Sequence, residues 1–115
     1  MLNLFSSSKN YKSISPQDAK KRFESDKKVL LIDVRTPEKF HNLRIPNSIS
    51  VPLSSIKENI TRVAPNKDTE IIVYCQSGAR ASTACNELVK MGYTNISNMG
   101  GILSWPFETV KTNSN

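Results

Sequence analysis

Two nearly continuous apolar runs dominate the hydrophobic pattern of the chain. They read "VLLIDV" at residues 29–34 and "EIIVYC" at residues 70–75, and neither alternates between apolar and polar positions. Such runs are typical of strands that are buried on both faces of a parallel sheet. Two shorter segments, 48–51 between prolines and 95–99, predict two further strands.

Apolar residues at helical spacing separate these strands. Ser15 and Pro16 mark a helix start, because a serine side chain caps free N–H groups and proline suits the first turn. Ala19 and Phe23 then face the core, and Thr36 is the expected cap of the next helix. The predicted helices span 16–24, 36–42, 54–63, 80–91 and 102–110; Gly92 ends the fourth, Gly100 and Gly101 form a tight turn, and Pro106 interrupts or begins the last.

Strands that alternate with helices predict an α/β fold, in which helices cover both faces of a parallel sheet. Ligands of such folds bind beyond the carboxyl ends of the strands. Cys75 closes the second apolar run, so we expect its side chain at that edge of the sheet. The position makes Cys75 a candidate for chemistry as well as for packing.

The segment after Cys75 leads directly into a predicted helix. Main-chain N–H groups of this loop and the positive end of the helix favour an anion at the sulfur. Gly78 allows backbone angles that a side chain would forbid, and Arg80 adds a full positive charge. We therefore expect the pKa of the Cys75 thiol to fall by about a unit or more, which makes it the candidate nucleophile. The candidate binding loop consists of Gln76, Ser77, Gly78, Ala79 and Arg80.

Two other residues with reactive side chains, Cys85 and His41, are interpreted as structural. Cys85 falls on the apolar stripe of the predicted helix 80–91, so we expect an inert core thiol, with a resolving role toward Cys75 as the alternative. His41 has no evident partner and is expected on the surface. Two cysteines and one histidine cannot supply four zinc ligands without carboxylates, so we expect no metal, and we expect no cofactor.

The length of 115 residues suits one domain. We expect it to span 11–110, with a flexible leader at 1–10 and a flexible tail at 111–115. No apolar run reaches membrane-spanning length, and the first residues lack the basic start and long apolar stretch of a secretory signal. The cysteine count does not indicate a disulfide framework. The sequence thus predicts a cytoplasmic protein without membrane contact.

The net charge of +6 raises the question of nucleic-acid binding. Much of the excess lies in residues 1–28, which hold seven Lys and Arg against three acidic residues. The three aromatic residues of this segment, Phe5, Tyr11 and Phe23, are too scattered to form a stacking platform, and no groove-reading motif is present. We therefore interpret the basic segment as a solvated helix face, expect no nucleic-acid partner, and retain a mild preference for anionic partners.

Three motifs span nearly the whole chain: "LIDVRTPEKFHNLRIPNSISVPL" at 31–53, "CQSGAR" at 75–80 and "NMGGILSW" at 98–105. Their order and spacing resemble those of single-domain rhodaneses of the sulfurtransferase superfamily. The resemblance implies a three-layer domain in which helices flank a five-stranded parallel sheet. It also implies that Cys75 takes sulfane sulfur from thiosulfate or a persulfide donor. The loop amides then hold the persulfide until it passes to cyanide, a thiol or a partner protein.

Two observations keep alternatives open. Cysteine-dependent phosphatases, including those that share this fold, use Cys-x5-Arg, whereas four residues separate Cys75 from Arg80. The shorter loop suits a sulfur atom better than a tetrahedral phosphate, which leaves phosphatase or arsenate-reductase chemistry as the lesser alternative. Gln76 and Ser77 replace the cationic pair of the best-known thiosulfate-using members. This favours a persulfide donor or, alternatively, a non-catalytic sulfur carrier or docking module.

The first motif also departs from the family pattern. Residues 43–48 replace the usual Gly-His-Ile-Pro-Gly-Ala turn, and we expect this change to reshape the rim of the pocket. Arg35 is a candidate cleft residue that would help to hold an anion. The favoured alternative is structural: Asp33 bonds to neighbouring backbone and Arg35 pairs with a carboxylate, because buried charges need partners. Trp105 and the two glycines before it are expected to serve turns and packing.

Overall fold

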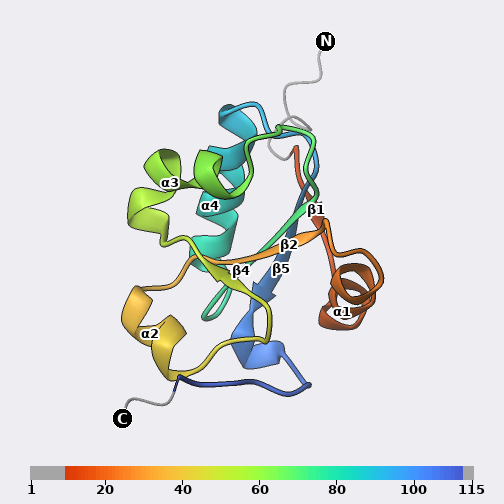
Figure 1. Ribbon diagram of the computed structural model, residues 1–115, viewed down its shortest axis with the longest axis vertical. Helices are drawn as coiled ribbons and strands as arrows, with labels where there is room; N and C mark the ends of the chain where they lie inside the picture. The colour runs from red at the N-terminus through yellow and green to blue at the C-terminus, as the bar shows by residue number, and fades with distance from the viewer. Residues whose placement is uncertain (1–9, 113–115) are drawn as a thin grey trace.

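The computed structural model describes residues 10–112, and five parallel strands form its single sheet (Figure 1). The order across the sheet is β1-β5-β4-β2-β3, so β4 lies at the centre. This arrangement confirms the expected α/β fold with a five-stranded parallel sheet. The strands are β1 (Lys12–Ser13), β2 (Leu30–Asp33), β3 (Ile49–Ser50), β4 (Ile71–Cys75) and β5 (Ile96–Gly101).

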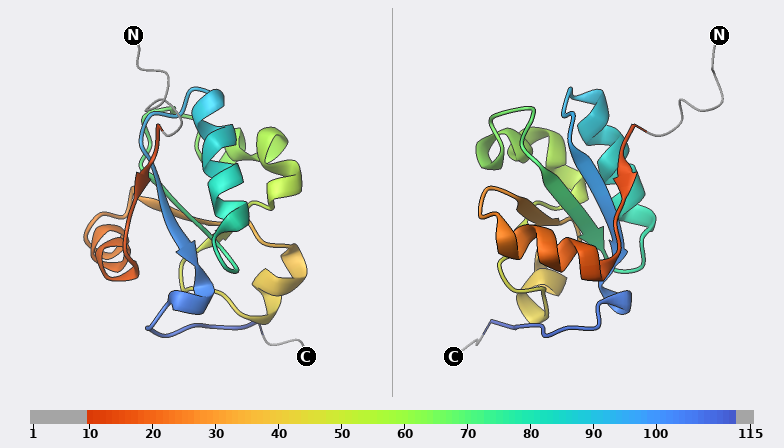
Figure 2. Two further views of the ribbon diagram at one scale, coloured as in Figure 1. Left: turned by 180° about the vertical axis from the view of Figure 1, so that it is seen from behind. Right: turned by 90° about the vertical axis from the view of Figure 1, so that its right-hand side faces the viewer.

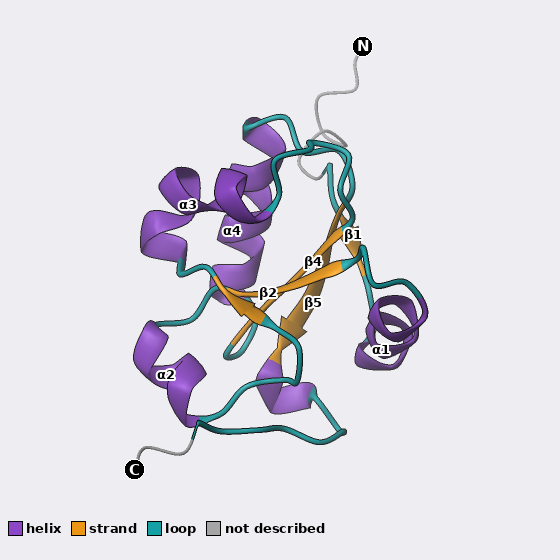
Figure 3. Cartoon of the chain, in the orientation of Figure 1, coloured by secondary structure: helices purple, strands orange, loops and turns teal. Residues whose placement is uncertain are grey.

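Helices cover both faces of the sheet, which makes three layers (Figures 1 and 2). One helix, α1 (Pro16–Ser25), lies on one face, whereas α3 (Ile56–Val63) and α4 (Ala79–Lys90) lie on the other. The short α2 (Pro37–Asn42) lies beyond the edge toward which β5 runs (Figure 3). Single turns of 3-10 helix, η2 (Leu53–Ser55) and η3 (Ile102–Ser104), follow β3 and β5.

Two apolar clusters fill the space between the sheet and its helices. Successive residues of β4 point to opposite faces, as in any strand. Val73 and Cys75 belong to the cluster under α3 and α4, whereas Ile72 and Tyr74 belong to the cluster under α1. All residues of β4 are buried, which explains its continuous apolar pattern. The side chain of Cys75 therefore faces α4.

Local signals in the sequence place the helix boundaries. The Ser15 hydroxyl accepts a hydrogen bond from the N–H of Asp18 at 3.1 Å, as expected for a capping serine. The Thr36 hydroxyl accepts one from Lys39 at the start of α2. Gly92 follows α4 with a φ of +101°, a conformation that glycine adopts readily. These three predictions are confirmed.

The predicted helix 102–110 is wrong beyond its first turn. After η3 the chain runs without regular structure, and Val110 forms an antiparallel bridge with Arg44. Pro106 lacks an N–H and favours this outcome. The predicted tight turn is also wrong, because Gly100 and Gly101 continue β5 along β4.

The pattern of the sequence did not predict β1, whose two residues are polar and exposed. Lys12 and Ser13 pair with Ser97 and Asn98 at the edge of the sheet. The predicted leader 1–10 lies outside the described residues except for its last position, and the predicted tail is described only to Thr112. Within residues 10–112, no helix has the length and apolar character needed to cross a membrane.

Candidate active site

Cys75 ends the central strand at the carboxyl edge of the sheet. Its side chain is only 1% exposed, and its Sγ accepts a hydrogen bond from the N–H of Gly78 at 2.9 Å. Gly78 has a φ of +119°, which a residue with a side chain would adopt only with strain. The glycine thus lets the chain turn back so that a main-chain donor meets the sulfur.

The same glycine precedes α4, a helix of 12 residues with no acidic residue in its first turn. A helix start carries unpaired N–H groups and a partial positive charge, both of which favour a nearby anion. Cys75 therefore stands between the end of a parallel strand and the positive end of a helix. Within the predicted loop, Gln76 and Gly78 are partly buried, whereas Ser77, Ala79 and Arg80 are exposed.

Gly101 supports this loop from β5, a role that the sequence-based turn assignment missed. A Cβ atom at position 101 would lie 2.3 Å from the carbonyl oxygen of Gln76 and 2.6 Å from the Cα of Ser77. The N–H of Leu103 also donates to the Gln76 carbonyl, at 3.3 Å. The signal was present in the sequence, because a glycine inside a strand often marks a close backbone approach.

Asn98 links β5 to the beginning of α4. Its Oδ1 accepts a hydrogen bond from the N–H of Gly100 at 2.8 Å, and its Nδ2 donates to Ser82 Oγ at 3.2 Å. Gly100 has a φ of +94° and lies where the register between β4 and β5 shifts. One side chain thus holds both the irregular end of β5 and the first turn of the helix behind the loop. Sequence analysis gave this residue no role.

Arg35 is buried, and its charge is compensated within the first motif. Its guanidinium donates to both carboxylate oxygens of Asp33, with Nη2 to Oδ2 at 2.7 Å and Nε at 3.1 Å from each oxygen. The N–H of Arg35 donates to the same carboxylate, and Nη2 also donates to the carbonyl of Leu43. The favoured expectation, a paired Arg35 and a backbone-bonded Asp33, is confirmed.

Arg35 and Arg80 nevertheless line one cavity of about 320 Å³. The cavity lies over the carboxyl ends of β2 and β3, beside the first turn of α4. The structure thus brings the candidate cleft residue close to the last residue of the predicted loop. Cys75 is not among the residues that line this cavity.

Cys85 lies in the helix layer, on the inner side of α4, and is fully buried. Burial raises the pKa of its thiol to about 12, and the negative charge of a Cys75 thiolate adds to the effect. Both cysteines are free thiols. The predicted core position of Cys85 is confirmed, as is the exposed position of His41, whose carbonyl accepts a hydrogen bond from the N–H of Thr112.

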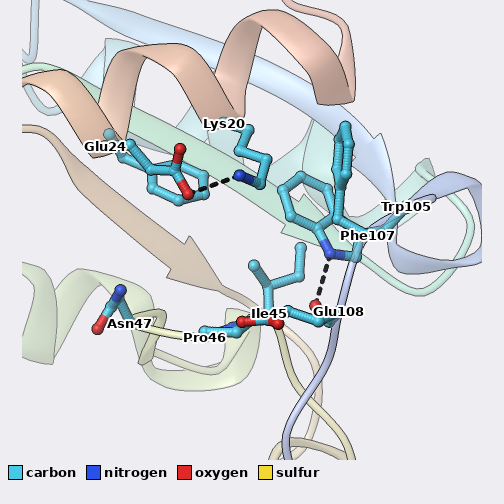
Figure 4. A pocket seen from close by; sticks show the side chains of 9 residues that line it. Lys20, Glu24, Ile45, Pro46, Asn47, Trp105, Phe107 and Glu108 are labelled. Carbon is cyan, nitrogen blue, oxygen red and sulfur yellow. Dashed lines mark hydrogen bonds and ion pairs between the residues drawn. The ribbon is translucent and has the colours of Figure 1, made fainter.

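A second cavity, of about 290 Å³, lies on the α1 side of the sheet (Figure 4). The turn 45–47 forms one wall of this cavity. Trp105 forms another wall as a buried packing residue, as expected, and its indole N–H donates to the carbonyl of Glu108 at 2.9 Å. Lys20 and Glu24 form an ion pair of 2.7 Å at its edge. None of the predicted site residues lines this cavity.

Within the part of the chain that the structure describes, no group of three or more His, Cys, Asp and Glu side chains could hold a metal ion. The fold and site define a class of protein: an α/β domain whose central strand ends in a cysteine, with a short loop and a helix start around the sulfur. Residues 15–106 match the model of the rhodanese-like domain, so the chain belongs to the rhodanese-like family.

Named relatives agree with this assignment. The chain is 33% identical over 93 residues to a sulfurtransferase of Allochromatium vinosum, a match that covers 80% of this chain and 85% of that protein. It is 36% identical over 80 residues to PspE, a thiosulfate sulfurtransferase of Escherichia coli, with 70% and 77% covered. These relatives support sulfur transfer as the general chemistry of the chain.

A solved structure described as a rhodanese with anions from E. coli is 34% identical to this chain. The two superpose with a TM-score of 0.65, covering 72% of this chain and 98% of the other. The fold and the general chemistry therefore rest on both sequence and structural similarity.

Proposed function

We propose that this protein is a sulfurtransferase that carries sulfane sulfur as a persulfide on Cys75. One observation carries the proposal: the N–H of Gly78 donates to the Cys75 sulfur, at the carboxyl edge of the sheet and at the start of α4. A donor in this place stabilises negative charge on the sulfur. The thiolate is the form of cysteine that attacks an electrophile.

The reaction consists of two displacements at sulfur. The Cys75 thiolate attacks the outer sulfur of the donor, the bond between that sulfur and the rest of the donor breaks, and sulfite or a thiolate leaves with the electron pair. Cyanide or a thiol then attacks the terminal sulfur of the persulfide, the bond to Sγ breaks, and its electron pair returns to Sγ. The Gly78 N–H stabilises the anionic sulfur at the beginning and end of this cycle.

The loop favours a persulfide donor over thiosulfate. Thiosulfate carries two negative charges, but Gln76 and Ser77 are neutral and Arg80 contributes the loop's one positive side chain. We therefore expect thiosulfate to load the enzyme less efficiently than a small organic persulfide.

A sulfur carrier that docks with a partner protein is the second candidate function. Leu103 favours it, because this side chain is 71% exposed while its N–H bonds to the loop at Gln76. An exposed leucine beside the reactive loop offers a partner an apolar contact at the point of transfer. As a carrier, the protein would accept sulfur readily but release it slowly to small acceptors.

The experiment that tests the proposal separates sulfur loading from turnover. The protein is exposed to thiosulfate or a small persulfide, and the Cys75 peptide is weighed for a gain of about 32 Da, the mass of one sulfur atom. Loading followed by thiocyanate production on addition of cyanide supports the enzyme, whereas loading without turnover supports the carrier. If no donor adds sulfur to Cys75, the proposed function is wrong.

The proposed partners are a small sulfur donor, a thiol or cyanide acceptor, and a protein that supplies or receives sulfur. The cytoplasm is the proposed compartment, because both cysteines are free thiols and a reducing environment preserves them.

A further inference from the structure

Arg80 faces the 320 Å³ cavity beside the Cys75 loop without a partner for its charge. The cavity has apolar and hydroxyl walls and no acidic residue among those that line it. Among residues 10–112, nothing forms an ion pair or a side-chain hydrogen bond with Arg80. A guanidinium next to a cavity is a binding point for an anion from solution.

The other cation of the cavity is not available in the same way. Arg35 already shares its guanidinium with Asp33 and with the carbonyl of Leu43. Elsewhere on the protein, Arg22 pairs with Glu70, and Lys57 with Glu87. One guanidinium of the cavity is therefore compensated and the other is free. The cavity can thus bind one anionic group.

The other residues that line the cavity determine which chemical group can be attached to that anion. Val34 and Leu53 offer apolar surface, and Ser54 offers a hydroxyl from η2, just before α3. A carbon chain of a few atoms fits a volume of this size. One carboxylate pairs well with one guanidinium, because two parallel hydrogen bonds form between them. The combination of walls and charge matches a small aliphatic carboxylate.

Position links this cavity to the sulfur. Arg80 is the last residue of the loop that begins at Cys75, and the N–H of Val34 donates to the carbonyl of Tyr74, the neighbour of Cys75 in β4. The cavity therefore lies at the same edge of the sheet as the reactive thiol.

We propose that the Arg80 cavity binds the carboxylate of a small organic thiol, or of its persulfide, and so sets the substrate class of the protein. This inference rests on the proposed function for the transfer step but not for the binding step. The acceptor thiol gives its proton to solvent, and its thiolate attacks the terminal sulfur of the Cys75 persulfide. A new S–S bond forms, the bond to Sγ breaks with its electron pair returning to Sγ, and the acceptor leaves as a persulfide. The carboxylate stays on Arg80 throughout and takes no part in bond making.

Binding is tested first, with a probe that cannot react. We would titrate the protein with 3-(methylthio)propionate and with its neutral analogue 3-(methylthio)propan-1-ol, and follow the backbone amide signals by NMR. The acid should bind about tenfold more tightly than the alcohol, with shifts at Thr36, Ser54 and Arg80, because one charge-assisted hydrogen-bond pair is worth about that ratio. Equal affinity for both probes, or shifts confined to other regions, would overturn the inference.

Two matched arginine variants separate the cavity from the general positive field. Arg80→Gln should remove the preference for the acid, whereas Arg62→Gln, an exposed arginine of α3 that does not line the cavity, should keep it within about twofold. If both variants lose the preference equally, the effect belongs to net charge and the inference is wrong. An unchanged preference in Arg80→Gln overturns it as well.

Transfer is tested next, on protein already loaded with sulfur. The rate of persulfide discharge is compared between 3-mercaptopropionate and 2-mercaptoethanol, and Arg80→Gln should lower the ratio of the two rates about tenfold. A parallel fall with both thiols places Arg80 at the sulfur and overturns the inference. If sulfur never loads onto Cys75, the binding titration still shows whether the cavity binds the carboxylate. Failure of the proposed function is therefore distinguishable from failure of this inference.

Discussion

Cys75 and Cys85 lie in the same apolar cluster and are buried to nearly the same degree, 1% and 0% exposed. The two sulfur atoms differ in their place in the fold and in the groups that contact them. Cys75 ends a strand and receives a hydrogen bond from Gly78, whereas Cys85 lies within α4, where burial raises the pKa of the thiol to about 12. Burial disfavours the thiolate form of a cysteine, whereas a main-chain donor aimed at the sulfur favours it. This contrast is the basis on which we propose different roles for the two cysteines.

Removing each sulfur in turn is the strongest way to test this contrast. Cys75→Ser should lower the rate of cyanide-dependent thiocyanate production by about a thousandfold, because the persulfide route is lost. Cys85→Ser should keep most of the activity, since the proposed mechanism does not use that thiol. Equal losses in the two variants would contradict the roles assigned to them.

The backbone support of Cys75 can be disturbed without touching either cysteine. Gly101→Ala places a Cβ 2.3 Å from the Gln76 carbonyl oxygen, so the loop must move, and we expect the free energy of unfolding to fall by about 3 kcal/mol. Gly100→Ala meets no atom within 4 Å and carries only the strain of its φ of +94°, so the loss should be about 1 kcal/mol.

Urea unfolding measures the stability of both glycine variants. The rate of Cys75 persulfidation shows whether the loop itself has moved. The Gly101 variant should be slower to load sulfur than the Gly100 variant at equal folded fraction. The reverse order would show that Gly101 does not support the loop.

The dependence of protein stability on alkaline pH should reveal the raised pKa of Cys85. Its folded-state pKa is raised to about 12 from an ordinary value of 9.0, so the neutral thiol stabilises the folded protein fully below about pH 9. That contribution is lost as the pH rises from about 9 to 12, and near pH 10.5 it amounts to about 2 kcal/mol. The free energy of unfolding, measured with urea across this pH range, should therefore fall more steeply in the wild type than in Cys85→Ala.

Labelling gives an independent measurement of the same difference. At about pH 8 a thiol reagent should modify Cys75 first and Cys85 only after unfolding, because a thiol with a raised pKa holds little thiolate. Native Cys85 that reacts as fast as Cys75 would remove the basis of the comparison.

Asn98 offers the mildest perturbation. Asn98→Ala removes the hydrogen bonds to Gly100 and Ser82, and we expect it to lower the free energy of unfolding by about 1 kcal/mol and to slow sulfur loading of Cys75. Asn98→Asp keeps the acceptor for the Gly100 N–H and should recover part of the loading rate. A variant that loses stability but loads sulfur at the wild-type rate would make Asn98 a purely structural residue.

Much of the architecture was predictable because its signals are local. Two apolar runs placed β2 and β4, and single capping residues such as Ser15 and Thr36 placed helix starts. The position of Cys75 at the carboxyl edge followed from the same pattern. The edge strand β1 was not predictable in this way, because Lys12 and Ser13 gain their extended structure from pairing with β5.

The C-terminal third shows where local signals fail. Gly100 and Gly101 have the composition of a turn, yet they lie in β5 because the loop after Cys75 packs directly on Gly101. The segment after Ser104 has some helical spacing, but the bridge of Val110 with Arg44 holds it extended. These choices depend on partners that are distant in the sequence.

The sequence by itself determined the alternation of strands and helices and the place of Cys75 at the end of a buried strand, because hydrophobic period and capping act over a few residues. Only the tertiary structure decided which residues support the loop around that sulfur. Gly101 under the loop, Asn98 behind it and the free charge of Arg80 in a shared cavity all arise where separate elements meet. Contacts of that kind exist only after the sheet and its helices have packed together.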